Sequence, residues 1–502
     1  MRRLVLLTAA AILLIGSTAT AFFTGAYFEQ ARLVAGITAW VLVLVVALIG
    51  PRPLPKQWPG WTAVAALAFL TAWTGASVSW APMATPAVDD VERLLLYLAV
   101  LLAAIGLLRI REVARALEPV LALGIVVVIG YGLAGRLLPG IIELSRSAGA
   151  FGRLEQPITY WNAEGALAAI GLVLCARLIG DRSRPLAMRA LSAAACAPLG
   201  MGVYLSYSRG AIAAAVVGLV VLIAAAPTTD QLRATGLALL SGLVAGACSS
   251  AFAGVASLSG SAADRERDGA IMLALLLIIM AAASLAAVWD ARRAPAQVNR
   301  LRFADRLPAL AAVAVALAVA GLFAGGLGER GERSSERLAT ASPSRLTSVS
   351  SRRYDYWRIG LDAFADHPLR GVGAGGFRAE WLRERPVKES VREAHSLELG
   401  IAAELGLPGL VALLLALGAV GVAARRALRA GQPLAAGCLA ASTAWILHAS
   451  IDWDWEIPAV TLPVIVMAGA LIAASEADPP LADEYSEAAS APASRREHPV
   501  QA

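Results

Sequence analysis

The sequence predicts an all-α fold, a polytopic transmembrane helix bundle of about 12–14 spans. A large extracytoplasmic loop with short amphipathic helices is expected between two of these spans. Three observations lead to this prediction. First, 58% of the 502 residues are hydrophobic and only 16% are charged, whereas soluble domains average about 25% charged residues. Second, apolar runs close to the ~20 residues that cross a bilayer recur along the chain. Third, the short segments between these runs carry arginine in alternation, as topology-setting loops do.

The apolar runs divide the chain into four parts. N-terminal transmembrane helices are expected over 1–325, a large loop over 326–397, C-terminal transmembrane helices over 398–475, and a disordered cytoplasmic tail over 476–502, which is rich in Glu, Ala, Ser and Pro. The predicted spans are 4–25, 31–50, 61–79, 94–108, 117–135, 163–179, 190–206, 210–226, 234–256, 269–289, 307–325, 398–423, 434–450 and 458–475.

The basic residues orient these spans. All of them except Lys56 and Lys388 are arginine, so arginine is the default cation of this chain. Alternate short loops carry the positive charge, which places them and both termini in the cytoplasm. These loops contain Arg52 and Lys56, then Arg109, Arg111 and Arg115, then Arg182, Arg184 and Arg189, then Arg292, Arg293, Arg300, Arg302 and Arg306, and finally Arg425, Arg426 and Arg429.

Four polar clusters fall on the opposite, extracytoplasmic side. The first is the segment 151–162, in which Arg153, Glu155 and Gln156 are the reactive groups and Asn162 is positioned to cap the next helix. An interfacial loop with an aromatic belt made by its Tyr-Trp pair explains this segment equally well.

The second cluster is the short turn Ser206-Tyr-Ser-Arg-Gly210 between two spans. Arg209 lies at membrane depth beside a predicted helix N-terminus, where a guanidinium and free backbone N–H groups together form an anion site. Ser206 and Ser208 add hydroxyl groups, which favours this interpretation over an interfacial arginine that only extends towards water.

The third cluster begins with an amphipathic helix. Tyr354, Trp357, Leu361 and Phe364 recur at helical spacing, so this helix is expected to lie on the membrane or to cap the bundle. His367 and the proline after it end the helix.

A glycine-rich segment, Gly371-Val-Gly-Ala-Gly-Gly376, follows this helix. It matches the dinucleotide-binding fingerprint, but it does not follow a strand, so we reject a Rossmann site. A tight turn that offers backbone N–H groups to a phosphate is the alternative expected here.

His395 stands just before the next span, where the helix N-terminus disfavours the imidazolium form. It is therefore a candidate neutral general base, and the alternative is a helix cap. Glu398 lies one turn further along, and Glu404 lies about two turns into the span, where an unpaired carboxylate is costly.

The fourth cluster is His448-Ala-Ser-Ile-Asp-Trp-Asp-Trp-Glu456. Asp452 and Asp454 alternate with tryptophan, a pattern suited to sugar binding or to an interfacial belt that caps the last helix. Two carboxylates are weak evidence for a divalent cation.

The four cysteines lie singly in or beside apolar runs without metal-ligand spacing, so they are expected to be small buried hydrophobic residues. They are Cys175, Cys196, Cys248 and Cys438.

Taken together, three of these segments resemble the O-antigen ligase/O-antigen polymerase superfamily of bacterial membrane glycosyltransferases. They are Ser206–Gly210, the run from Trp357 through Asp366-His-Pro-Leu to Gly376-Phe, and Ala394-His-Ser-Leu-Glu398 with Glu404-Leu-Gly-Leu-Pro-Gly409. The resemblance covers about residues 150–475. The chain departs from the family in having Ser396 where asparagine often follows the histidine, and in having more predicted spans than the usual twelve.

The resemblance implies that a glycan moves from a polyprenyl diphosphate to an acceptor hydroxyl, with inversion, at the outer side of the bacterial cytoplasmic membrane. Arg209, and after it Arg153, would bind the diphosphate, and His395 would accept the hydroxyl proton. No metal or other cofactor is required, and no nucleic acid partner is expected. Substrate binding is assigned to Arg153, Glu155, Gln156, Ser206, Ser208, Glu398, Glu404, Asp452 and Asp454.

Two other classes stay open at this point. A flippase or transporter of lipid-linked sugars predicts polar groups along a path through the bundle. A scaffolding protein predicts no convergence of Arg153, Arg209 and His395.

Overall fold

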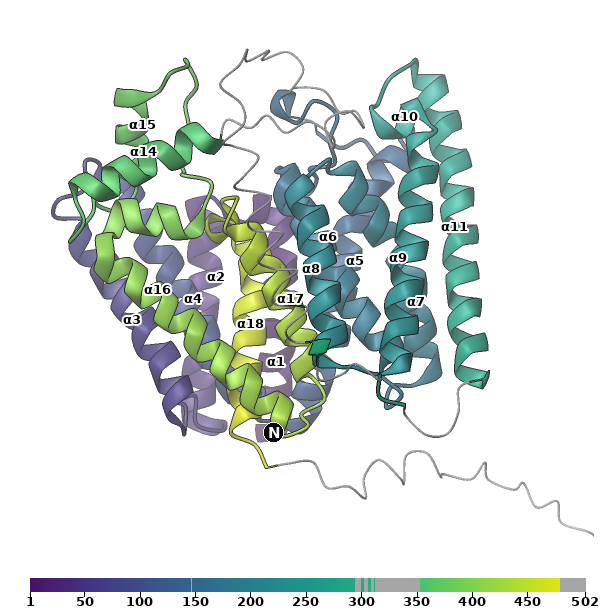
Figure 1. Cartoon of the computed structure of the whole chain (residues 1–502), viewed down its shortest axis with the longest axis horizontal. Helices are drawn as coiled ribbons and strands as arrows, with labels where there is room; N and C mark the ends of the chain where they lie inside the picture. The colour runs from purple at the N-terminus through teal and green to yellow at the C-terminus, as the bar shows by residue number, and fades with distance from the viewer. Residues whose placement is uncertain (146, 294–298, 302–305, 308–310, 312–352, 479–502) are drawn as a thin grey trace, which may run out of the picture.

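The computed structural model describes residues 1–145, 147–293, 299–301, 306–307, 311 and 353–478. Over these residues the chain is helical, with one isolated β-bridge between Thr228 and Arg300 and no strand, so the predicted all-α class is confirmed. The helices run side by side in one bundle (Figure 1). The N-terminus lies at one end of the bundle, which we call the N-terminal end, and α14 and α15 lie at the other, which we call the loop end.

The long helices coincide with the predicted apolar runs. Within the described residues, nine helices are long and apolar enough to cross a membrane, and α8 and α17 are two further, shorter apolar helices. The predicted run 307–325 lies almost entirely outside the described residues. The helices are α1 (Arg2–Ala19), continued by the 3-10 segment η1 (Thr20–Ala26), α2 (Glu29–Ile49), α3 (Trp58–Ser77), α4 (Ala84–Leu107), α5 (Arg111–Leu137), α6 (Trp161–Gly180), α7 (Leu186–Leu205), α8 (Arg209–Ala225), α9 (Thr229–Ser250), α11 (Ala262–Arg293), α16 (Leu397–Arg429), α17 (Ala435–Ala449) and α18 (Pro458–Ser475). Shorter segments are η2 (Ala148–Ala150), α10 (Ala253–Ala256) and η4 (Asp454–Glu456).

Small residues let the helices approach closely. α6 is almost completely buried and packs against α5, α7, α8, α9 and α17. On the neighbouring pair, a Cβ atom added to Gly200 of α7 would collide with the backbone of Gly242 of α9. Such contacts are expected because helices in lipid associate through close packing and not through the hydrophobic effect.

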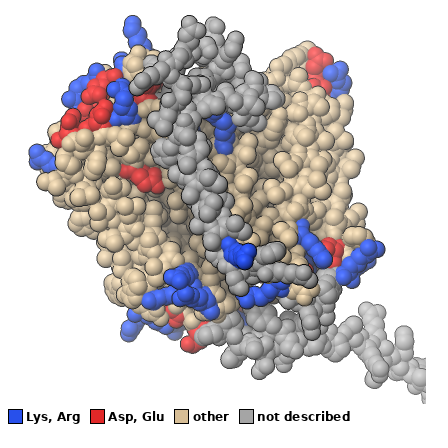
Figure 2. Space-filling view, in the orientation of Figure 1, with Lys and Arg blue, Asp and Glu red and all other residues tan. Residues whose placement is uncertain are grey.

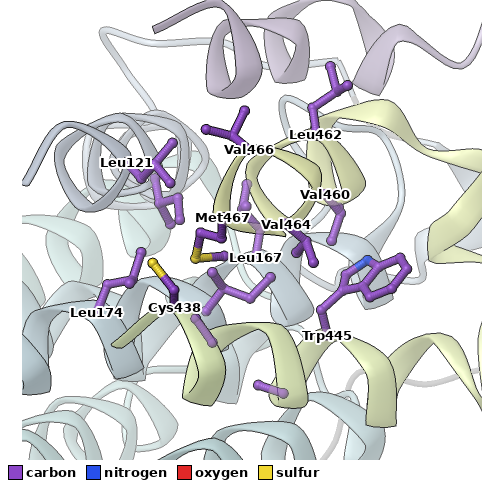
Figure 3. Close-up of a cluster of buried hydrophobic side chains, with 14 of the residues drawn as sticks. Leu121, Leu167, Leu174, Cys438, Trp445, Val460, Leu462, Val464, Val466 and Met467 are labelled. Carbon is purple, nitrogen blue, oxygen red and sulfur yellow. The ribbon is translucent and has the colours of Figure 1, made fainter. Parts of the chain in front are cut away.

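The apolar core lies where α18 meets α6 and α17. Figure 3 shows Met467 of α18 directed at Leu167 of α6 and Cys438 of α17, with Trp445 packed beside Val460. Cys438 is fully buried and carries a free thiol, as do Cys175 and Cys196, while Cys248 is partly buried. The predicted burial is thus confirmed for Cys175, Cys196 and Cys438, and Cys248 is only partly buried.

Charged groups gather at the two ends of the bundle. On the face shown in Figure 2, Lys and Arg line the N-terminal end, charges of both signs cover the loop end, and the band between them is mostly uncharged. The last turns of α11 and α16, which carry arginines of two of the predicted cytoplasmic loops, lie at the N-terminal end (Figure 1). There Arg109 pairs with Glu476 at 2.7 Å, and Arg426 Nη1 donates to Gln57 Oε1 at 2.7 Å.

Glu476, the first residue of the predicted disordered tail, is instead packed against the bundle. Its side chain is only 1% exposed, and it accepts hydrogen bonds from the backbone N–H groups of Lys56 and Gln57 at 2.8 and 3.0 Å. The ordered chain therefore extends past α18, because this carboxylate satisfies backbone donors just before α3. The remainder of the predicted tail, 479–502, lies outside the described residues.

Two helices of the large loop lie at the loop end, above α3, α4 and α16 (Figure 1). They are α14 (Arg353–Asp366) and α15 (Phe377–Glu384). The predicted helix before His367 is confirmed. Trp357 of the predicted apolar stripe is buried together with Tyr356 and Ile359, while Leu361 is 51% exposed. α14 packs against α15 and α16, and this packing covers only part of the stripe.

α16 is interrupted at Gly406, whose φ of 66° and ψ of −164° are not helical. Residues 372 and 373, which precede α15, form hydrogen bonds with the α16 backbone at this interruption. Val372 N–H donates to the carbonyl of Ala403 at 3.0 Å, and Gly373 N–H donates to that of Glu404 at 2.8 Å. Backbone groups freed by the break are thereby paired, as they must be at membrane depth.

The expectation of a phosphate-binding turn at 371–376 is wrong. Besides the two bonds to α16, Ala374 N–H donates to Ser77 Oγ at 3.1 Å, and Gly376 N–H donates to the carbonyl of Gly373 at 2.9 Å. Gly371 has φ +65°, and an added Cβ would collide with the backbone of Glu404. This close packing requires Gly371, because a side chain there would collide with α16. These backbone N–H groups already donate to protein acceptors, so they are not offered to a phosphate.

Candidate active site

The polar clusters predicted from the sequence lie at the loop end, where five segments meet. These are the start of α6, the turn before α8, the start of α14, the approach to α16, and the loop between α17 and α18. Their side chains form a continuous set of contacts.

Asp452 is at the centre of this set and is completely buried. Tyr160 Oη donates to Asp452 Oδ1 at 2.7 Å, and Arg353 donates to Oδ2. The backbone N–H of Trp453 donates to Oδ1 at 2.9 Å. Burial by itself raises the pKa of Asp452, but Arg353 and the nearby histidines outweigh burial and hold that pKa below its usual range. Asp452 is therefore a carboxylate that fixes Arg353 and Tyr160 at the start of two different helices.

Asn162 does not cap α6. The helix begins at Trp161, and no side chain bonds to its first N–H groups. Asn162 Nδ2 donates to Tyr160 Oη at 2.8 Å, so that the phenol is held from both sides. Burial, with Asp452 adding to it, raises the pKa of Tyr160 well above its ordinary value. Tyr160, which the sequence suggested only as a belt residue, is thus a neutral donor to Asp452.

His395 lies beside this centre with an unusual backbone conformation, φ +53°. Such left-handed geometry costs a non-glycine residue about 1–3 kcal/mol and is frequent at functional sites. Its Nδ1 lies 2.9 Å from the carbonyl oxygen of Glu393. A carbonyl only accepts hydrogen bonds, so Nδ1 carries the proton and Nε2 keeps a free lone pair. Burial lowers the pKa of His395, with Asp452 partly opposing, which favours the neutral ring.

The cap of α16 is the residue after the histidine. Ser396 Oγ accepts from Leu399 N–H at 3.4 Å. Serine and asparagine are both good N-cap residues, so the serine found here fits the role that asparagine at this position would have. Glu398 accepts from Ser450 Oγ at 2.8 Å and so ties the start of α16 to the end of α17.

The predicted turn before α8 is confirmed, with Arg209 as the first helical residue. Ser208 Oγ caps the helix by accepting from Ala211 N–H at 3.2 Å. Ser206 is completely buried, donates through Oγ to the carbonyl of Val203 at 2.7 Å and accepts from Ser208 N–H at 3.2 Å. The two serines therefore shape the turn that presents Arg209.

His448 is a site residue for which sequence reasoning found no role. Its Nε2 lies 3.4 Å from Ser208 Oγ, and its Nδ1 lies 2.5 Å from Asp454 Oδ2. All three residues are buried. Burial raises the pKa of Asp454, and the contact with His448 opposes this. The sequence does show His448 six residues before Asp454 at the end of a span, which is a local signal for this pair. Its other partner, Ser208, is 240 residues away in the chain, so the sequence does not reveal that contact.

A series of aromatic contacts connects Arg153 with His395. Its guanidinium lies over the ring of Trp161 at 4.3 Å, and burial lowers its pKa to about 10. Trp161 contacts Tyr160, whose ring centre lies 4.6 Å from that of Trp453. The ring of Trp453 in turn lies 6.3 Å from that of His395.

Three predicted substrate-binding residues, Glu155, Gln156 and Glu404, form hydrogen bonds with neighbouring groups of the protein. Glu155 is buried and accepts from Ser147 N–H at 2.7 Å and from its hydroxyl. Gln156 Nε2 donates to the carbonyl of Ser145 at 2.8 Å. Glu404 accepts from Phe377 N–H at 3.1 Å. These contacts order the loop before α6 and the start of α15.

Asp452 and Asp454 have different partners, since the first contacts Arg353 and Tyr160 and the second contacts His448. Within the described residues, no group of three or more His, Cys, Asp or Glu side chains is arranged to hold a metal ion.

Residues 267–414 match a family model described as O-antigen ligase. The matched residues make up less than half of the chain. The match confirms the resemblance to the O-antigen ligase/O-antigen polymerase superfamily. A comparison with curated proteins found no match.

The matched region contains Arg353, His395 and Glu398, while Arg209 and Asp452 lie outside it. It therefore contributes the starts of α14 and α16, and the starts of α6 and α8 and the loop after α17 contribute the rest of the site. The family and the apolar helices indicate a multi-pass bacterial membrane protein with a role in glycan transfer during polysaccharide synthesis.

Proposed function

We propose that this protein transfers a glycan from a polyprenyl diphosphate to an acceptor hydroxyl at the loop end of the bundle. The observation that carries the proposal is the meeting of the neutral His395 ring, the Asp452–Arg353–Tyr160 centre and the start of α8. A base, cations and buried hydroxyl groups at one end of a membrane bundle suit a sugar acceptor and an anionic leaving group.

His395 serves as the general base. Its Nε2 accepts the proton of the acceptor hydroxyl while the hydroxyl oxygen forms a bond to the anomeric carbon. The bond between that carbon and the diphosphate oxygen breaks, and its electron pair leaves with the diphosphate. One displacement of this kind inverts the anomeric configuration.

Arg209 stabilises the charge that develops on the diphosphate. Its guanidinium and the backbone N–H groups at the start of α8 are both suited to phosphate oxygens. The positive end of the α8 dipole lies at the same place. Arg153 is the second candidate, since its guanidinium is buried beside Trp161. Ser208 and His448 hold the start of α8, so they act through Arg209 as positioning residues.

One observation favours a transporter of lipid-linked sugars as the second candidate function. Broken transmembrane helices often form the substrate sites of transporters, and α16 is broken at Gly406. However, the backbone of residues 368–373 occupies that break, so glycan transfer is the function supported better.

The positive-inside rule supports an extracytoplasmic position for the loop end, because the arginine-bearing ends of α11 and α16 lie at the opposite end of the bundle. Single cysteines introduced by Leu369→Cys and Gln432→Cys in a cysteine-free background test this. An impermeant thiol reagent applied to intact cells should label the first variant only. Labelling of Leu369→Cys only after permeabilisation would reverse the orientation.

The proposed reaction is tested with purified protein in lipid nanodiscs, a glycan on a polyprenyl diphosphate, and a glycan acceptor. The expected products are glycosylated acceptor and free polyprenyl diphosphate in equal amounts, both lost in Arg209→Ala. Movement of intact donor across proteoliposomes with no glycosylated acceptor would favour the transporter instead. In cells, deletion distinguishes a ligase from a polymerase by whether surface glycan is lost or shortened to one unit.

A further inference from the structure

An apolar groove lies between α1 and α2, with α4 and α18 as its floor. Its volume is about 450 Å³. One face of α2 lines it from Gln30 to Leu42, and Leu96 and Leu462 lie at its base. The hydroxyl of Ser17 in its wall donates to a carbonyl of α1, so the surface offered to a ligand is apolar. None of the residues given a role in the proposed reaction lines this groove.

The groove has the depth of one membrane leaflet. The twelve helical steps from Gln30 to Leu42 span ~18 Å at 1.5 Å per residue. Half of the hydrocarbon core is ~15 Å thick. The groove begins at the loop end, where α2 starts, and its length suits a lipid chain of the leaflet on that side.

The mouth of the groove is continuous with the candidate active site. Ala26 lines the groove, and Tyr27 follows it directly in the chain. The ring centre of Tyr27 lies 5.5 Å from that of Trp453, the same tryptophan that contacts Tyr160 and faces His395. A chain seated in the groove would therefore end next to the proposed base.

A cation stands at this mouth. Arg392 is exposed, and its Nη1 donates to Tyr27 Oη at 3.3 Å. Arg32 is buried nearby, where it pairs with Glu92 at 2.9 Å and donates to the carbonyl of Tyr27 at 2.8 Å, and so fixes the backbone at the mouth. Glu393 and Asp89 lie near this guanidinium. Arg392 is nevertheless the exposed donor at the end of the apolar groove, and a guanidinium can bind an anionic head group.

We infer that the groove between α1 and α2 holds the polyprenyl chain of the lipid diphosphate donor. This inference rests on the proposed function and adds the place and class of the donor lipid. A phospholipid acyl chain has similar apolar chemistry, but its head group would occupy the mouth that opens on the site. The donor is the lipid whose head group must reach that point.

Filling the groove tests the inference. Gly16 lines the groove, and no heavy atom lies within 4 Å of a Cβ added there, so Gly16→Leu places a side chain in the groove without a backbone clash. Gly236→Leu in α9 is the matched control, because that glycine is equally open and lies away from the groove. Transfer is measured with two donors that differ only in their lipid, a long polyprenyl diphosphate and a two-isoprene diphosphate.

Gly16→Leu should raise the KM of the long donor about five- to fiftyfold and leave that of the short donor within about twofold. Gly236→Leu should change neither. An unchanged ratio of the two KM values in Gly16→Leu would overturn the inference, as would a ratio changed equally by the control.

A second measurement is independent of transfer. A photoreactive polyprenyl diphosphate should crosslink to peptides of α1 and α2, and unlabelled polyprenyl diphosphate should compete. Crosslinks confined to other helices, or competition by phospholipid alone, would refute the inference. If the parent protein crosslinks in the groove but transfers no glycan, the proposed function fails and the lipid site stands.

Discussion

His395 is the residue whose replacement tests the proposed chemistry most directly. We choose His395→Asn, because asparagine tolerates the left-handed backbone that His395 adopts at φ +53°. Asparagine cannot accept a proton at neutral pH, so the variant removes the base and leaves the helix start intact. Ser396 still caps α16 in this variant.

The expected loss follows from the role of the ring. Nδ1 is held by the carbonyl of Glu393, so Nε2 alone can take the acceptor proton. Loss of a general base lowers the rate by ~10²–10⁴, which corresponds to about 3–5 kcal/mol of transition-state stabilisation. The KM of the lipid donor should stay nearly constant, because the imidazole contributes to proton transfer and not to diphosphate binding.

The pH profile gives a second readout. Burial lowers the pKa of His395 from its usual value of 6.5, so the ring is neutral and active above that range. Activity should fall on acidification, about tenfold per pH unit below the pKa of the ring. His395→Asn should lose this acid limb together with its rate.

The assay is steady-state transfer of a labelled glycan, with abundance and melting temperature measured in parallel. His367→Asn is the control, since His367 is exposed at the end of α14 and should keep the parent rate and pH profile. A His395→Asn enzyme with the parent rate and an unchanged acid limb would refute the assignment. The histidine would then be a structural residue at the start of α16.

Three further predictions concern other parts of the site and fold. Arg209→Ala should abolish transfer at normal abundance and Arg209→Lys should impair it strongly, measured as kcat/KM, because an ammonium cannot make the bidentate contact of a guanidinium; full activity of the alanine variant would return Arg209 to an interfacial role. Asp452→Asn should lower the rate and also move the acid limb to lower pH, because the Asp452 charge raises the pKa of His395; a limb that stays in place or moves to higher pH speaks against this coupling. Gly406→Ala should destabilise the protein by about 1–3 kcal/mol, seen as a lower Tm, because φ +66° with ψ −164° suits only glycine. Gly418→Ala, in open surroundings, should leave the Tm unchanged. Equal melting temperatures of the two variants would contradict the proposed role of the break.

The sequence alone was sufficient to predict the features that depend on neighbouring residues. Apolar runs of bilayer length became helices at the predicted places, and Ser208 caps α8 through a contact only three residues along the chain. The position of His395 before α16 and the alternation of arginine-bearing loops were likewise local patterns. Such features are readable because helices and their caps use bonds between residues three or four apart.

Only the tertiary structure decided which distant groups meet. Tyr160 and Asp452 are 292 residues apart, and Ser208 and His448 are 240 apart. Their contacts depend on which helices pack together, and apolar helix faces of similar composition do not encode that order visibly. The glycine segment after α14 illustrates the same limit. Its N–H groups bind the broken backbone of α16 and not a phosphate, because the break at Gly406 creates unpaired carbonyls that must be satisfied within the membrane.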